Sequence, residues 1–352
     1  MTVQAENLST AVDPKPEGDV TETERLLELI KRTDALFVCD SCPTTTELLQ
    51  KLLEGIISSA SLRIFSSAPK KVESAVPRLK GRVATLPPPV SPINEGTTIA
   101  QELSEGGSKV FVGTPRPDPL FGIIDTRVEA CLNWVAHARR EAANARKEME
   151  PSSFHRTESR EVIDDIAEGI IEASFIDIIP RGGSVKAVME NAPFDAIKNG
   201  FLSVTAAPAR AMVVGAGGKG YDDTLSSAVR TIWHALSGVR KSGSIVLMAE
   251  CSEGLGSTAL DMAATGRFSS EGGNKKEAHF DGAEDIFYLS KLRDEYDVLL
   301  LSGLPEVYAK SRLGLATARG SGEAVGRILN RLGRSGKMNV VTRAPECRIE
   351  SV

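Results

Sequence analysis

The order of apolar and polar positions along the chain predicts alternating helices and strands. Thr21 to Lys31 and Thr44 to Ala60 carry apolar residues at three- and four-residue steps, which is typical of amphipathic helices. Asp34 to Cys39 and the segment SLRIFSS at 61–67 are short apolar runs and predict buried strands. Because strand, helix and strand follow one another, this part of the chain indicates a parallel α/β sheet.

The same scheme returns further along the chain. Residues 211–250 predict a strand, a glycine-rich loop, a long helix and a second strand. Val298 to Ser302, Gly322 to Gly333 and Met338 to Val341 repeat strand, helix and strand. Between the two series, Phe175 to Ala192 predicts a hairpin that turns at Arg181-Gly182-Gly183.

Length and composition fit two domains. The chain has 352 residues, of which 41% are hydrophobic and 25% charged, as is usual for globular proteins with sizeable cores. We expect α/β domains over residues 21–205 and 206–352, with parallel or mixed sheets that flank a cleft. Residues 1–20 are polar and lack the pattern of a signal peptide, and they predict a disordered tail.

Charge and cysteine content limit the partners. A net charge of −5 gives no global attraction to nucleic acid or to an anionic membrane. The basic run at 138–147 is flanked by glutamates, so we interpret it as a solvated helix face. No apolar run reaches the roughly 18 residues of a membrane span. Five scattered cysteines indicate a reducing compartment, so we expect a cytoplasmic protein. Homo-oligomer formation stays open.

The segment VVGAGGKGYDD is the richest local motif. Gly215, Gly217 and Gly220 give G-x-G-x-x-G between a predicted strand and a predicted helix, a geometry in which backbone N–H groups bind anions. Asp222 or Asp223 is expected to cap the helix. Because glycine strings are common in such loops, an ordinary turn is an equally good interpretation.

Three other polar segments could carry chemistry. Cys39-Asp40-Ser41-Cys42 is a C-x-x-C, either a redox or metal pair or two cysteines by chance. Glu253 follows a predicted buried strand, where loops of α/β sheets line ligand sites. His155 lies in a polar break from which it could reach a cleft, whereas His234 lies on an apolar helix and is expected to be a packed side chain.

Taken in order, these segments resemble the lactate racemase family. In the second half, the matching residues include Gly217, Gly218, Asp222 and the E-G-x-G at 253–256. Earlier, FVCDSCPTTTELLQKLLEG is similar to the family's strand that ends in D-x-T-R-P-x-P. The segment PDPLFGIIDTRV resembles its central H-P-x-x-G-x-x-G-G-x-K loop. The resemblance spans roughly residues 30 to 345.

The resemblance implies two α/β domains around a cleft and an enzyme that racemises 2-hydroxy acids. Family members carry a nickel pincer nucleotide, tethered through a lysine, that accepts hydride from the α-carbon. Histidines ligate the nickel and act as acid and base. Here the central histidine falls on Asp118 and the tethering lysine on Val128.

Other family positions are changed as well. The strand-end G-x-H-R reads Ser66 to Lys70, without a histidine, and the arginine of T-R-P is absent from Asp40 to Pro43. The helix that carries Y-Q-x-x-K in the family reads Ser226 to Arg230, and only Arg230 keeps a positive charge. A carboxylate at Asp118 is a poor substitute for imidazole on nickel.

These departures favour a catalytically degenerate relative that binds a small anion, such as a hydroxy acid or a nucleotide, without metal or cofactor. The expected ligand-binding residues are Asp40, Gly217, Gly218, Asp222, Ser227 and Arg230. Two alternatives stay open. One is a racemase or epimerase with recruited catalytic residues, for which the candidates are Asp118, Glu253, His155 and Cys42. The other is the intact family activity with the nickel pincer nucleotide held noncovalently.

Overall fold

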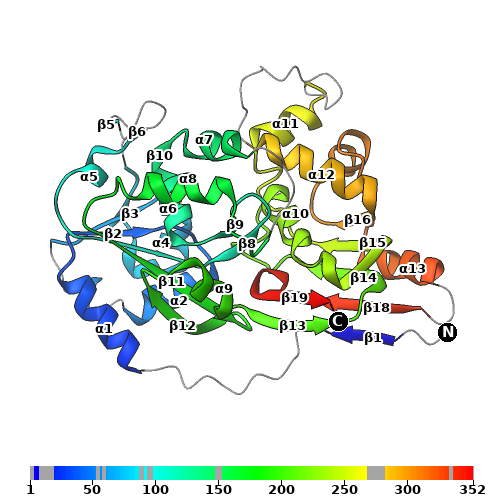
Figure 1. Cartoon of the computed structure of the whole chain (residues 1–352), viewed down its shortest axis with the longest axis horizontal. Coiled ribbons are helices and arrows are strands. Elements are labelled where there is room, and N and C mark those ends of the chain that lie inside the picture. The colour runs from blue at the N-terminus through cyan, green and yellow to red at the C-terminus, as the bar shows by residue number, and fades with distance from the viewer. Residues whose placement is uncertain are drawn as a thin grey trace.

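The protein is an α/β structure built on two six-stranded sheets, each covered by helices on both faces (Figure 1). The computed structural model describes residues 4–7, 20–52, 56–57, 61–86, 91–92, 98–146, 153–267, 282–332 and 336–351. The fold class predicted from the sequence is confirmed. We call the part from residue 20 to residue 200 the N-terminal half and the part from residue 209 onward the C-terminal half, to which residues 4–7 and 202–206 add strands.

The sheet of the N-terminal half contains five parallel strands and one antiparallel edge strand. Its order is β12 (Ser184–Glu190), β11 (Ala173–Arg181), β7 (Lys109–Gly113), β2 (Ala35–Val38), β3 (Arg63–Ser66) and β4 (Val83–Ala84). The predicted hairpin is β11 and β12, and its turn places Gly182 and Gly183 at φ values of 62° and 83°, which glycine adopts without strain.

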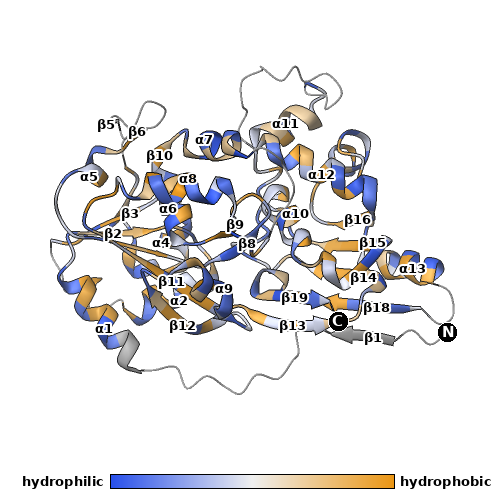
Figure 2. Cartoon of the chain, viewed as in Figure 1, coloured by the Kyte–Doolittle hydropathy of each residue, from blue (hydrophilic) through white to orange (hydrophobic). Residues whose placement is uncertain are grey.

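Helices cover both faces of this sheet, which explains the uninterrupted apolar runs of its central strands. One face is covered by α1 (Val20–Lys31), α2 (Pro43–Lys51) and α4 (Pro69–Ala75). The other is covered by α6 (Thr126–Trp134), α7 (Ala138–Ala145) and α8 (Glu158–Ala167). Figure 2 shows these strands as mainly apolar. The predicted helix at 44–60 is confirmed as far as Lys51; residues 53–55 and 58–60 lie outside the described residues.

The sheet of the C-terminal half is entirely parallel. Its order is β1 (Gln4–Asn7), β18 (Lys337–Val341), β14 (Ala209–Gly215), β15 (Val239–Met248), β16 (Asp297–Leu301) and β17 (Ala316–Thr317). Helices α10 (Leu225–Trp233), α11 (Thr258–Ala264) and α12 (Ala283–Glu295) pack on one face, and α13 (Ser321–Leu332) packs on the other.

Strand β1 corrects the expectation of a disordered tail. Gln4 to Asn7 pair in parallel with Lys337 to Val340 at the edge of the C-terminal sheet. An edge strand offers unpaired backbone N–H and C=O groups, so a polar segment can pair with it without an apolar side-chain pattern. The tail prediction is therefore wrong for these residues, whereas residues 1–3 and 8–19 lie outside the described chain.

Shorter elements connect the two halves. Helix α9 (Phe194–Gly200) leads into β13 (Leu202–Ala206), which pairs in parallel with β19 (Cys347–Ser351). The remaining short elements are α5 (Gln101–Ser104), β5 (Ser91–Pro92), β6 (Thr98–Ile99), β10 (Val135–Ala136), β8 (Arg116–Asp118) and β9 (Gly122–Ile124). None of the helices in the described ranges combines the length and apolar character needed to cross a membrane.

Candidate functional site

The short hairpin of β8 and β9 brings Asp118 to the contact between the two halves. Its carboxylate is fully buried, and Oδ1 accepts hydrogen bonds from the backbone N–H groups of Leu120 and Phe121 at 2.7 and 3.0 Å. Oδ2 accepts from Nη1 of Arg230 on α10 at 2.6 Å. Asp118 therefore shapes its own turn with one oxygen and reaches the C-terminal half with the other.

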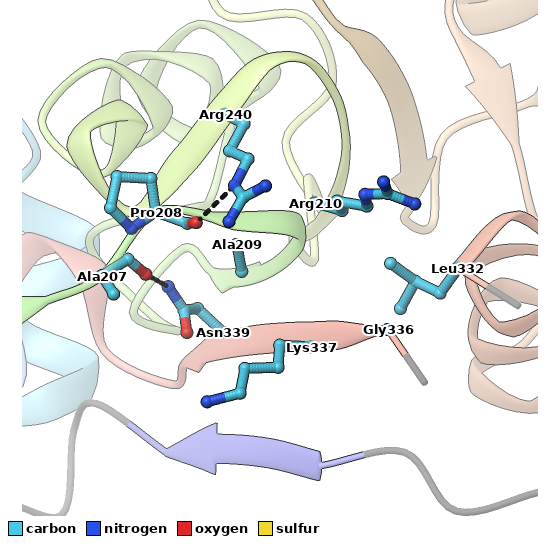
Figure 3. Close-up of a pocket in the computed structure, with 9 residues that line it drawn as sticks. All are labelled: Ala207, Pro208, Ala209, Arg210, Arg240, Leu332, Gly336, Lys337 and Asn339. Atoms are coloured by element: carbon cyan, nitrogen blue, oxygen red, sulfur yellow. Dashed lines mark hydrogen bonds between the residues drawn. The ribbon is translucent and has the colours of Figure 1, made fainter. Parts of the chain in front are cut away.

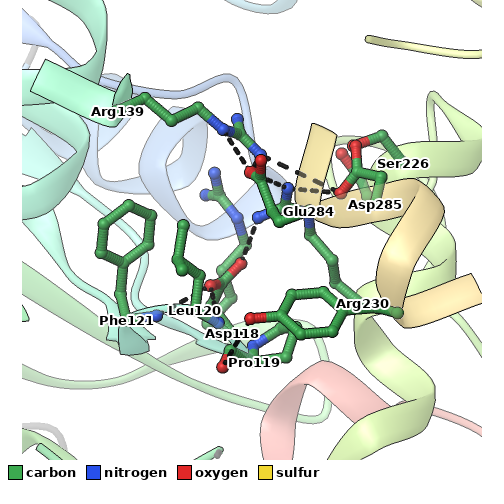
Figure 4. Close-up of polar contacts among 12 residues, drawn as sticks. Asp118, Pro119, Leu120, Phe121, Arg139, Ser226, Arg230, Glu284 and Asp285 are labelled. Atoms are coloured by element: carbon green, nitrogen blue, oxygen red, sulfur yellow. Dashed lines mark hydrogen bonds and ion pairs between the residues drawn. The ribbon is translucent and has the colours of Figure 1, made fainter. Parts of the chain in front are cut away.

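Arg230 lies at the centre of a buried ionic cluster, shown in Figure 4. Its Nη2 donates to Asp285 Oδ1 at 2.5 Å and to Glu284 Oε1 at 3.1 Å, both at the start of α12. From the N-terminal half, Arg139 on α7 donates through Nε to the same Glu284 oxygen at 2.6 Å. The ionic cluster, defined as Asp118, Arg139, Arg230, Glu284 and Asp285, thus joins the two halves at two points.

The charges in the ionic cluster are unequal, because it holds three carboxyl groups and two guanidinium groups. Burial opposes the charged form of Arg230, but Asp285, Asp118 and Glu284 raise its pKa well above the ordinary value. Burial raises the pKa of Glu284 to about 7, although Arg230 acts in the opposite direction. Oε2 of Glu284 is buried and has no hydrogen-bond partner in the described structure. With a pKa of about 7, Glu284 is partly protonated at neutral pH, and the unpaired Oε2 is the oxygen available to carry that proton.

Further contacts also join the two halves. Lys71 on α4 forms ion pairs with Asp223 at 3.0 Å and with Glu253 at 2.7 Å. The thiol of Cys42 faces the carbonyl oxygen of Gly220 at 3.6 Å. A Cβ at Gly220 would lie 2.8 Å from the Cα of Cys42, so only glycine permits this approach.

The glycine loop does not present a free helix N-terminus, which favours the ordinary turn over the anion-binding interpretation. Helix α10 begins at Leu225 and is capped by Thr224, not by Asp222 or Asp223, and the Thr224 side chain accepts from the N–H of Ser227. The N–H groups of Leu225 and Ser226 donate to carbonyl oxygens of the Gly254–Leu255 segment. Because these donors are satisfied within the protein, they are not open to an anion.

The other expected ligand-binding residues also hold the backbone together. Asp40 accepts from the N–H groups of Cys42 and Thr114 at 2.8 and 2.6 Å. Gly217 and Gly218 adopt φ values of 103° and 82° in the turn that leads to Tyr221. Asp222 Oδ2 accepts from the N–H of Glu250, while its buried Oδ1 has no partner in the described chain.

The catalytic candidates are not brought together. His155 is exposed on a segment whose backbone packs against Gly122. Glu253 is paired with Lys71, whereas Asp118 is buried beside Arg230. No hydrogen bond or ion pair within the described ranges joins any two of these candidates, so they form no acid–base pair in this conformation.

The positions that resemble cofactor ligands do not fit a nickel pincer nucleotide. Val128 on α6 is fully buried in the apolar core and offers no amine for a tether. Both oxygens of Asp118 are already used by Leu120, Phe121 and Arg230. Burial also raises the pKa of the Cys39 and Cys42 thiols well above the ordinary value, which opposes a metal-binding or redox thiolate.

Sequence reasoning did not identify Arg139, Glu284 or Asp285 as members of a site. Arg139 belongs to the basic run that was expected to be solvated, and its guanidinium instead forms an ion pair with Glu284 of the C-terminal half. Glu284 and Asp285 stand in the first turn of α12, where acidic residues are common for local electrostatic reasons. Nothing in the spacing of these residues signals their contact. His234, in contrast, is a buried packed side chain as predicted.

Comparison with solved structures identifies the fold. The lactate racemase apoprotein from Thermoanaerobacterium thermosaccharolyticum matches with a TM-score of 0.69 at 13% sequence identity, over 99% of this chain and 94% of that chain. A protein from Thermotoga maritima matches with a TM-score of 0.58 at 12% identity, over 97% of this chain and 100% of that chain. No protein-family model and no curated protein matches the sequence. The resemblance seen in the sequence is thus confirmed at the level of the fold.

Proposed function

We propose that this protein is a catalytically degenerate relative of lactate racemase that binds a small carboxylate anion, such as a 2-hydroxy acid, between its two halves. The observation that carries the proposal is the contact between Asp118 and Arg230. At the position where the resemblance places a histidine, this chain has a carboxylate that contacts the one cation retained on α10 at 2.6 Å. The fold alone does not decide between an enzyme and a binding protein, since function depends on the residues of the site.

In this proposal, the ligand carboxylate takes the place of the Asp118 side chain beside Arg230. Arginine binds carboxylates through short, charge-assisted hydrogen bonds, and Nη1 of Arg230 makes one such contact with Asp118. Its Nη2 is held by Asp285 and Glu284. A ligand carboxylate that displaces Asp118 therefore finds a cation whose orientation is already fixed, and separation of the two halves gives it access.

The first test is calorimetric titration with lactate and with malonate as a dicarboxylate comparison. Asp118→Asn weakens the internal competitor, so we expect lactate to bind at least about tenfold more tightly to this variant, equivalent to about 1.4 kcal/mol. Arg230→Met should abolish binding. A matched control is Asp164→Asn, which removes a carboxylate from Arg160 within the N-terminal half and should leave lactate affinity unchanged. Weaker binding to Asp118→Asn than to wild type would refute the proposal.

The second test concerns the cofactor and catalysis. We expect protein produced in a host that makes the nickel pincer nucleotide to show the mass of the bare polypeptide in native mass spectrometry. We also expect it not to interconvert the two lactate enantiomers. A bound mass that contains nickel would restore the racemase hypothesis with a noncovalent cofactor, and racemisation without nickel would point to recruited catalytic residues.

We also propose a cytoplasmic location. All five cysteines are free and buried in the structure, which suits a reducing compartment. Fractionation of the native host, with the protein recovered in a membrane or secreted fraction, would contradict this part of the proposal.

A further inference from the structure

A cavity of about 510 Å³ lies at the amino-terminal ends of inner strands of the C-terminal sheet (Figure 3). Its lining includes Ala209 at the start of β14, Arg240 at the start of β15 and Lys337 at the start of β18. The contact between the two halves involves loops that follow the carboxyl ends of β14 and β15. The cavity is therefore separate from the ionic cluster, and its volume is in the range that accommodates a drug-sized ligand.

The cavity is lined by cations. Arg210, Arg240 and Lys337 contribute to the lining, and no carboxylate does so among the described lining residues. Arg240 Nε donates to the carbonyl oxygen of Pro208 at 2.9 Å, which fixes the guanidinium and leaves its terminal nitrogens available as donors. The Arg210 side chain is exposed and forms no hydrogen bond or ion pair with any residue in the described ranges. This environment attracts a negatively charged group.

The other lining residues suit the uncharged organic part of a ligand that carries such a negatively charged group. Pro208, Ala209 and Leu332 present apolar surface. Asn339 is 2% exposed, and its Nδ2 donates to the carbonyl oxygens of Ala207 and Gly238 at 3.0 and 2.7 Å. With both amide hydrogens used, the Asn339 side chain offers the cavity only its acceptor oxygen, which matches a hydroxyl or amino group.

We propose that this cavity binds a phosphate-bearing small molecule of nucleotide size, with its phosphates near Arg210 and Arg240. Arginine suits this role because its planar donors match the oxygens of a phosphate group. The apolar lining and Asn339 contact the organic part of the ligand. This site is independent of the carboxylate site, so either proposal can fail without the other.

The experiment is calorimetric titration of the full-length protein with ADP and with inorganic pyrophosphate at physiological ionic strength. We expect saturable binding of ADP, with an affinity at least about tenfold higher than that of pyrophosphate, because only ADP carries a nucleoside that can contact Asn339. Arg210→Gln and Arg240→Gln should each weaken ADP binding by about tenfold or more. The matched control is Lys241→Gln, which removes a neighbouring exposed cation that is not part of the lining.

The position of the nucleotide site is tested by amide hydrogen exchange of the protein with and without ADP. We expect the segments at 207–210 and 336–339 to gain protection, and the loop at 217–224 to remain unchanged. Absence of saturable ADP binding, equal affinity for pyrophosphate, or equal losses in Lys241→Gln and Arg240→Gln would overturn the proposal. Protection confined to the loop at 217–224 would place the nucleotide at the contact between the halves and would also overturn it.

Discussion

The pair formed by Asp118 and Arg230 allows a quantitative test of how the two halves are held together. The two residues are 112 positions apart in the sequence, and their side chains are 1% and 9% exposed. Arg230→Met removes the cation but keeps an unbranched apolar chain of similar reach. Asp118→Asn removes the negative charge but keeps an oxygen that can accept from the N–H groups of Leu120 and Phe121.

The expected losses follow from what each change leaves unpaired. Arg230→Met leaves Asp118 and Asp285 buried with less compensation, which costs about 4 kcal/mol of unfolding free energy. Asp118→Asn leaves Arg230 with Asp285 and Glu284, so we expect a smaller loss of about 2 kcal/mol. In the double variant the Asp118 charge is no longer present to be stranded. We therefore expect the double variant to lose about as much unfolding free energy as Arg230→Met alone. The two single losses then exceed the loss of the double variant by about 2 kcal/mol, which is the coupling energy of the pair.

The assay is urea unfolding at pH 7, followed by tryptophan fluorescence and circular dichroism. Trp134 belongs to the core of the N-terminal half, and Trp233 on α10 belongs to the C-terminal half, so the fluorescence reports on both. Coincident transitions by the two probes are required before free energies are compared, because a chain of this size can unfold in more than one step.

A control cycle on an exposed pair sets the baseline. Glu306 and Lys310 are 49% and 65% exposed at an i,i+4 spacing, and their coupling should not exceed about 0.5 kcal/mol. If the losses in the Asp118 and Arg230 variants add within that same margin, the two side chains do not form the buried pair. The proposed competition between Asp118 and a ligand for Arg230 would then also be refuted.

Three further outcomes are expected. The pKa of Glu284 is raised by burial from 4.5 to about 7, so the folded state binds more protons than the unfolded state between these values. The unfolding free energy should therefore fall by up to roughly 3 kcal/mol as pH rises from 4.5 to 7 and then level off. Urea midpoints should change less with pH in Glu284→Gln than in the wild type, and an equal pH dependence would contradict the raised pKa of Glu284. Val128→Lys places an amine in the apolar core and should cost several kcal/mol of unfolding free energy without creating a cofactor tether. Thermal unfolding measures the loss of stability and metal analysis measures the nickel content; a stable variant that takes up nickel would refute this prediction. Gly122→Ala places a Cβ 2.0 Å from the carbonyl oxygen of His155 at a φ of 76°, so a loss of about 2 kcal/mol or more is expected in urea unfolding, and a neutral effect would show that the His155 segment does not pack there.

The sequence predicts the elements of the sheets because their signals are local. The buried parallel strands β2, β7 and β16 are short apolar runs, and the β11–β12 turn is marked by Gly182 and Gly183. Strand β1 could not be predicted in this way, since it pairs through its backbone with an available sheet edge.

The candidate site was only partly predictable, because its contacts join distant segments. Asp118 and Arg230 were selected for different reasons, one as a catalytic candidate and the other as an anion ligand, and only the fold shows that each is the other's partner. Charge patterning on α7 likewise indicates a polar helix face but not what lies opposite it. The same charges suit water or a carboxylate, and only the folded chain brings Arg139 to Glu284.

The charge balance of the ionic cluster also limits which ligand can enter it. In the state in which Glu284 is protonated, which predominates below pH 7, the charges of Asp118 and Asp285 balance those of Arg139 and Arg230. The proposal requires that Asp118 turns toward solvent when a monocarboxylate takes its place, and the charge balance of the cluster is then preserved. A dicarboxylate would add a second negative charge beside Asp285, and a neutral ligand would leave Arg230 undercompensated, both of which are costly in a buried site. The arrangement therefore favours a monoanion, which is why lactate should bind more tightly than malonate.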